Sequence, residues 1–175
     1  MTFVYPCIII GLLTIIVYQD FRHRALSVSV LIAALLIVIT NNLVVNGWEH
    51  ALLYAGVNLL LIAIQMIGIT LYFSIKRRGF TNIINTYLGS GDLWFYGILT
   101  CSFSPLNFML FNLMACMVIL VIYAFTRFNK GGSGTIPLAG CLALAMVLVL
   151  MMSFVLSGIR PYDDWILASK MFAGN

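Results

Sequence analysis

The sequence predicts an all-α integral membrane protein, built as a bundle of six transmembrane helices of which the fourth is short. The 175 residues are 63% hydrophobic and only 8% charged, whereas a soluble domain carries about 25% charged residues. Apolar runs recur at close to the ~20 residues that a crossing helix needs. Because no long polar segment separates these runs, residues 1–175 are predicted to form a single membrane-embedded domain.

The predicted helices follow the apolar runs in order, at residues 3–18, 26–45, 51–75, 91–103, 108–125 and 136–156. The first run lacks a basic n-region and an A-x-A cleavage site, so we expect a retained helix and not a signal peptide. The fourth run is too short to cross alone. It is predicted to begin earlier, near Tyr87, or inside the membrane beside Gly89. Residues 159–175 are mixed in character and are predicted to lie on the membrane surface.

The positive charges predict the orientation of the bundle. Seven cations fall in the loops on one side of the predicted helices, namely Arg22, Arg24, Lys76, Arg77, Arg78, Arg127 and Lys130. The positive-inside rule makes that side cytoplasmic, with both termini external. This distribution also accounts for the net charge of +4, and no basic patch is large enough to predict a nucleic-acid partner.

The four cysteines do not predict a metal site. They lie within apolar runs, and none belongs to a C-x-x-C pair, which is the spacing typical of zinc ligands. We therefore expect neither a metal nor a cofactor.

Two of the five acidic residues are candidates for chemistry. Asp20 ends the first predicted helix and Asp92 opens the fourth, so the topology brings both to the same membrane face. Acidic residues at membrane depth are costly and are functional candidates. Each also has a structural interpretation: Asp20 as a solvated helix end beside arginines, and Asp92 as a helix N-cap or first-turn acid.

The residues directly before Asp92 are small. Gly89, Ser90 and Gly91 are predicted to let a peptide substrate approach the carboxylates closely, and the glycines permit a positive φ. A simple turn is the other interpretation. No base that would activate Ser90 as a nucleophile is evident.

Three short segments resemble the motifs of the type IV prepilin peptidases, especially their short forms. Residues 18–26 (YQDFRHRAL) are similar to the first aspartate motif, and residues 89–92 (GSGD) match the G-x-G-D motif. The stretch I-P-L-A at 136–139, followed by Leu142, resembles the opening of the family's last helix. Two departures are Ser27-Val28 in place of Pro-Asn, and Trp94 in place of Lys.

The resemblance implies an aspartyl endopeptidase in a bacterial-type inner membrane. Asp20 and Asp92 would be the catalytic pair, and the substrate a prepilin-like or pseudopilin-like protein with a short basic leader. The longer relatives carry a cytoplasmic domain with paired C-x-x-C motifs and also N-methylate their product. This sequence has no such segment, so the resemblance implies peptidase activity without methyltransferase activity.

Two other functions stay open from the sequence. Presenilin-type and signal-peptide-peptidase-type proteases also use G-x-G-D, but they have more helices and a Tyr-Asp pair, whereas Gln19 here separates Tyr18 from Asp20. The alternative from another class is a non-catalytic six-helix membrane protein, either a small transporter or a degenerate assembly scaffold. A transporter usually shows repeats and a midplane site, and the sequence shows no repeat.

Overall fold

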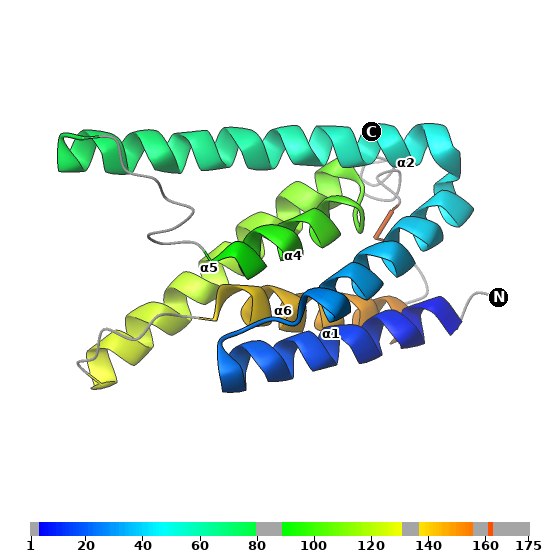
Figure 1. Cartoon of the computed structure of the whole chain (residues 1–175), viewed down its shortest axis with the longest axis horizontal. Coiled ribbons are helices and arrows are strands. Elements are labelled where there is room, and N and C mark those ends of the chain that lie inside the picture. The colour runs from blue at the N-terminus through cyan, green and yellow to red at the C-terminus, as the bar shows by residue number, and fades with distance from the viewer. Residues whose placement is uncertain (1–3, 80–88, 131–136, 156–160, 163–175) are drawn as a thin grey trace, which may run out of the picture.

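The computed structural model describes residues 4–79, 89–130, 137–155 and 161–162, and every regular element among them is a helix. The five helices are α1 (Val4–His23), α2 (Val28–Arg77), α4 (Ser90–Thr100), α5 (Pro105–Lys130) and α6 (Leu138–Val155). The all-α prediction is confirmed. The count of six helices is not confirmed, because the predicted helices at 26–45 and 51–75 are joined in the single element α2 (Figure 1).

A backbone break at Gly47 divides α2 into two arms, residues 28–46 and residues 48–77. Gly47 has φ 73° and ψ 169°, a combination that is essentially restricted to glycine. An unbroken helix of 50 residues would be about 75 Å long, more than twice the roughly 30 Å of a bilayer core. Figure 1 shows α2 turning sharply between its arms. The arms therefore correspond to the second and third predicted helices.

Several helix boundaries differ from the predicted ones. Helix α1 continues past Tyr18 to His23, so Asp20 lies within its last turns. Helix α5 is longer than predicted at both ends, and α4 and α6 are slightly shorter. Polar residues at helix ends explain the longer helices, because such residues continue the backbone hydrogen bonds after the apolar pattern stops. Apart from Pro161 and Tyr162, the predicted surface tail lies outside the described residues.

The outer faces of the bundle suit a lipid environment. Helices α1, α2 and α5 contain segments long and apolar enough to cross a membrane, at Tyr5–His23, Val28–Arg77 and Pro105–Phe125, and α6 contributes the shorter apolar segment Leu138–Ser153. Large apolar side chains on these helices are more than half exposed in the isolated chain, as Leu53 and Met114 are. An apolar exterior of this kind indicates a membrane-embedded protein.

The short helix α4 lies in the centre of the bundle (Figure 1), where its side chains Phe95, Ile98 and Leu99 are almost fully buried. Helix α1 packs along α6, and α2 packs against α4. The C-terminal ends of α1, α2 and α5 and the N-terminal ends of α4 and α6 all lie toward one side (Figure 1, left). The predicted cytoplasmic loops follow or precede these same helix ends.

The C-terminal end of α4 is closed by two asparagines, one from each arm of α2. The buried amide of Asn58 donates to the carbonyl oxygens of Thr100 at 2.9 Å and Phe103 at 2.8 Å. The amide of Asn42 donates to the carbonyl oxygen of Cys101 at 2.9 Å. The last carbonyls of a helix have no partner within the helix, and lipid cannot supply one. The bend at Gly47 allows both arms to reach this end of α4.

Candidate functional site

Asp20 lies on the buried face of α1. It follows Ile9, Leu13 and Ile16 at helical spacing, and its exposed fraction is only 8%. One carboxylate oxygen, Oδ2, accepts a hydrogen bond of 2.5 Å from the backbone N–H of Gly140 on α6. The other oxygen has no hydrogen-bond partner in the part of the chain that the structure describes. Asp20 is therefore a buried carboxylate facing α6, and its interpretation as a solvated helix end is wrong.

A tight corner between α1 and α2 holds Asp20 in place. Arg24 adopts the left-handed conformation, with φ 52°, and its N–H donates to the carbonyl oxygen of Asp20 at 3.1 Å. The side-chain oxygen of Gln19 accepts the backbone N–H of Ser27 at 3.0 Å, directly before α2. The corner returns Leu26 to the start of α4, where its side chain lies against Gly91.

Asp92 uses its two carboxylate oxygens for two different helices. Its Oδ2 accepts the N–H of Gly89 at 3.0 Å, which closes the start of its own helix α4. Its Oδ1 accepts the N–H of Ala139 on α6 at 2.9 Å. The interpretation of Asp92 as a capping residue therefore describes one oxygen correctly, while the other oxygen reaches across to α6.

The first turn of α6 brings the two aspartates together. Its amides Ala139 and Gly140 are consecutive in the chain, and each donates to a different carboxylate. Successive Cα atoms are only about 3.8 Å apart, and the first N–H groups of a helix have no acceptor within it. The positive end of the helix dipole also favours negative charge at this position. Two carboxylates from distant parts of the sequence thus share one helical turn.

The glycines at the site serve the packing of the chain itself. A Cβ atom on Gly140 would lie 2.9 Å from ring carbons of Phe21 and 3.0 Å from Oδ2 of Asp20. A Cβ atom on Gly91 would lie 2.9 Å from Cδ1 of Leu26. The missing side chains therefore allow α6 to approach α1 and α4 to approach the start of α2.

The expected use of positive φ by Gly89 and Gly91 is not found. Gly89 is extended, with φ −71° and ψ 149°, and Gly91 is part of α4. The residues at this helix start form an ordinary entry into a helix, because the carboxylate of Asp92 satisfies the free N–H of Gly89. Gly89 and Ser90 are exposed, so this side of Asp92 is open. Their contact with a substrate stays a prediction.

Burial and the neighbouring carboxylate make ionisation of Asp92 costly. Helix α4 is not among the candidate membrane spans. Burial raises the pKa of Asp92 above its usual value, the N–H groups of Gly89 and Ala139 lower it, and the negative charge of Asp20 raises it again. Two carboxylates at one site interact in this way because ionisation of the first opposes ionisation of the second.

The described residues contain no group of three or more His, Cys, Asp and Glu side chains that could hold a metal ion. The chemistry that these residues offer at the site is that of a carboxylate pair. One partially exposed acid and one buried acid with an unoccupied oxygen, each held by a backbone N–H of α6, are suited to binding and polarising a water molecule.

Sequence reasoning missed the backbone donors Ala139 and Gly140 and the corner residue Gln19. The segment at 136–139 was noticed only as a resemblance, and backbone N–H groups leave no side-chain pattern in a sequence. A signal for Asp20 did exist: it stands four residues after Ile16, on the apolar face of α1. The same spacing places Asp92 on the face of Phe95, Tyr96 and Leu99.

Comparison of the chain with models of protein families, with characterised proteins and with solved structures found no match.

Proposed function

We propose that the chain is a membrane-embedded aspartyl endopeptidase that removes the short basic leader of prepilin-like or pseudopilin-like proteins. The observation that carries the proposal is the pair of carboxylates, Asp20 and Asp92, held on consecutive amides at the start of α6. The resemblance of the segments at 18–26, 89–92 and 136–139 to type IV prepilin peptidase motifs supports it, since contacts between these segments build the site.

In the proposed mechanism the two aspartates share one proton. The ionised carboxylate removes a proton from a water molecule as the water oxygen attacks the carbonyl carbon of the scissile peptide bond. The protonated carboxyl donates to the carbonyl oxygen, and the leaving amine then takes up a proton as the C–N bond breaks. A coupled pair of this type titrates as a unit, so the roles belong to the pair. Sharing of one proton follows from the cost of two adjacent negative charges.

The proposed position of the reaction is the cytoplasmic face of a bacterial-type inner membrane. The C-terminal ends of α1, α2 and α5, which carry or flank the seven predicted cytoplasmic cations, lie on the same side as the N-terminal end of α4 (Figure 1). Asp20 belongs to the last turns of α1 and Asp92 to the first turn of α4. In this orientation the chain crosses the membrane six times if α4 counts as one crossing and α2 as two. A substrate with a basic leader would present its cleavage site where both carboxylates lie.

The test separates catalysis from helix capping. Asn keeps one acceptor oxygen, which is enough for the single N–H bond that Asp20 accepts, so Asp20→Asn is expected to fold normally. Asp92→Asn keeps only one of its two N–H bonds and should lose about 1–3 kcal/mol of stability, so its folding is checked by thermal unfolding. Each should reduce cleavage of a leader-bearing substrate by at least about 10²–10⁴-fold, the usual contribution of one acid–base group. Glu49→Gln, which changes an exposed acid elsewhere in the same way, should leave cleavage unchanged.

The competing function is a non-catalytic membrane protein, a small transporter or an assembly scaffold, in which both carboxylates serve only as caps. The hydrogen bonds from Gly89, Ala139 and Gly140 are compatible with that role. Retained cleavage in both Asn variants, or no cleavage by the purified wild-type protein, would favour this alternative over the peptidase.

A further inference from the structure

The helices that carry the two aspartates are placed relative to each other by other elements. Among the described residues, α1 and α4 make few direct contacts, whereas α1 packs on α6 and α2, and each of these also contacts α4. On the side of α6, the amides of Ala139 and Gly140 each donate to one carboxylate. An N–H can approach a carboxylate oxygen over a broad range of directions. The separation of Asp20 and Asp92 therefore also depends on the connection through α2.

Gln19 bridges the corner between α1 and α2. Its side-chain oxygen accepts the N–H of Ser27 at 3.0 Å, so the last turns of α1 are tied to the residue directly before α2. The hydroxyl of Ser27 does not cap α2. The start of α2 is thus fixed toward α1 by a side chain of α1, and not by a cap of its own.

The bridge reaches the second aspartate through Leu26. Its side chain fits so closely against Gly91 that a Cβ atom there would lie 2.9 Å from its Cδ1. Gly91 directly precedes Asp92, so a shift of Leu26 toward α4 moves the turn that carries this carboxyl group. Gln19 directly precedes Asp20 at the other end of the connection. One hydrogen bond therefore links the two backbone segments that carry the pair.

We propose that Gln19 is a positioning residue of the peptidase, which fixes the corner between α1 and α2 and thereby sets the separation of Asp20 and Asp92. The inference rests on the proposed function and adds to it a residue that acts through the corner and not on the substrate. A neutral amide suits this position, because a third carboxylate beside the pair would add to its repulsion.

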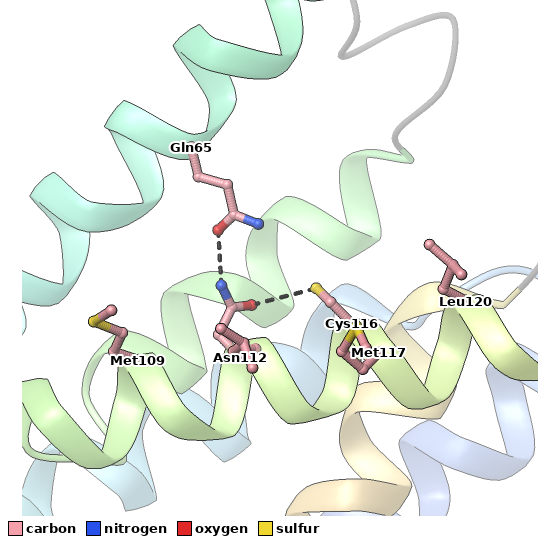
Figure 2. Close-up of a pocket in the computed structure, with 7 residues that line it drawn as sticks. Gln65, Met109, Asn112, Cys116, Met117 and Leu120 are labelled. Atoms are coloured by element: carbon pink, nitrogen blue, oxygen red, sulfur yellow. Dashed lines mark hydrogen bonds between the residues drawn. The ribbon is translucent and has the colours of Figure 1, made fainter.

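The test compares two glutamines that make similar bonds in different places. Gln19→Met keeps the length of the side chain and removes the amide oxygen that accepts the N–H of Ser27. The matched control is Gln65→Met. Gln65 is half-buried like Gln19 and accepts one hydrogen bond, from the amide of Asn112 at 2.8 Å. Figure 2 shows this pair pointing toward each other between α2 and α5. Both variants should lower the unfolding temperature by similar, small amounts.

The first readout is the pKa of Asp92, which can be measured without any cleavage. The negative charge of Asp20 contributes to raising this pKa. Because like charges move apart once the corner loosens, Gln19→Met should lower the pKa of Asp92 in an infrared titration of the carboxyl band. Gln65→Met should leave it at the wild-type value. An unchanged pKa in Gln19→Met, or an equal change in both variants, would overturn the proposal.

The second readout is the split between kcat and KM on a synthetic peptide with a basic leader. Displaced carboxylates slow the reaction without altering how the peptide binds. Gln19→Met should therefore lower kcat about 10- to 100-fold with KM nearly unchanged, and Gln65→Met should change neither constant. A higher KM at unchanged kcat in Gln19→Met would contradict a positioning role.

A rescue variant shows whether Gln19 acts through the corner. The backbone of Ser27 has φ −71°, close to the value of about −65° that a proline ring imposes. Proline at this position cannot donate a hydrogen bond but stiffens the corner. Adding Ser27→Pro to Gln19→Met should therefore restore most of the kcat and of the pKa of Asp92. Failure to restore either would exclude the corner as the route.

The outcomes separate this inference from the proposed function. Cleavage that depends on Asp20 and Asp92 but not on Gln19 would refute the positioning role and leave the peptidase intact. Absence of cleavage by the wild-type protein, together with a lowered pKa of Asp92 in Gln19→Met, would refute the peptidase, while the coupling of the two acids through Gln19 would stand.

Discussion

The two ends of α4 are both closed by side chains, but with opposite chemistry. At the C-terminal end, the neutral amides of Asn42 and Asn58 donate to backbone carbonyl oxygens. At the N-terminal end, the carboxylate of Asp92 accepts backbone N–H groups from α4 and α6, with Asp20 beside it on the next amide of α6. Each end therefore satisfies backbone groups that lipid would leave without partners.

The comparison shows which of these side chains carry a charge that capping of a helix end does not require. Donors are required at the C-terminal end, and asparagine supplies them without charge. Acceptors are required at the N-terminal end. A neutral Asn would serve as well as Asp at position 20, which accepts one N–H, but would keep only one of the two bonds at position 92. Burying a carboxylate costs more than burying a neutral amide. The negative charge of Asp20 is thus unnecessary for capping, and the proposed reaction gives it a purpose.

The largest effect is expected from exchanging the chemistry of the two ends. Asn58→Asp removes both donated hydrogen bonds and places a carboxylate against the carbonyl oxygens of Thr100 and Phe103. Leaving these groups unpaired and burying a charge should cost at least about 3 kcal/mol. The reciprocal change, Asp92→Asn, keeps one of the two N–H bonds and should cost less, about 1–3 kcal/mol. Thermal unfolding in detergent measures both. A stability of Asn58→Asp equal to that of the wild type would contradict this account of the C-terminal end of α4.

A smaller but still clear effect is expected where α6 approaches Asp20. In Gly140→Ala the added methyl group meets the ring of Phe21 at 2.9 Å and the carboxylate of Asp20 at 3.0 Å. Overpacking of this kind should lower the stability by about 1–3 kcal/mol. It should also reduce cleavage, because it moves α6 away from the aspartates. In the control Gly97→Ala nothing lies within 4 Å of the new atom. An equal loss in both variants would show that the close approach at Gly140 is unimportant.

The bend in α2 gives the next prediction, because it brings Asn42 and Asn58 to the same end of α4. Alanine in the conformation of Gly47 costs of the order of 1–3 kcal/mol, of which about 0.4–1 kcal/mol returns through the stiffer unfolded chain. Gly47→Ala should therefore destabilise the protein by about 1–2 kcal/mol. Gly56→Ala, in the second arm of α2 and with open space around it, should be neutral or slightly stabilising. The unfolding temperature of Gly47→Ala should therefore be lower than that of Gly56→Ala, and equal temperatures would contradict the role given to the bend.

The fold could be predicted from the sequence to the extent that apolar length determines it. The runs at 26–45 and 51–75 predicted the two arms of α2, but the interval between them did not reveal that a sharp bend at Gly47 joins the arms. Likewise, the topology of the helices places Asp20 and Asp92 at the same membrane face, and helical spacing places each on the buried side of its helix. Their actual partners are backbone amides of α6, and the room for them depends on Gly140, which only the packing of three helices specifies.

The smallest predicted effect tests whether the two carboxylates act as a pair. The negative charge of Asp20 is one of the influences that raise the pKa of Asp92, although burial contributes more. Removing that charge makes ionisation of Asp92 easier, so Asp20→Asn should lower the pKa of Asp92, while Glu49→Gln should leave it unchanged. Infrared titration of the carboxyl band measures this shift. If the pKa of Asp92 does not fall, the two acids do not share a proton, and a water activated between them is excluded even though α6 holds both.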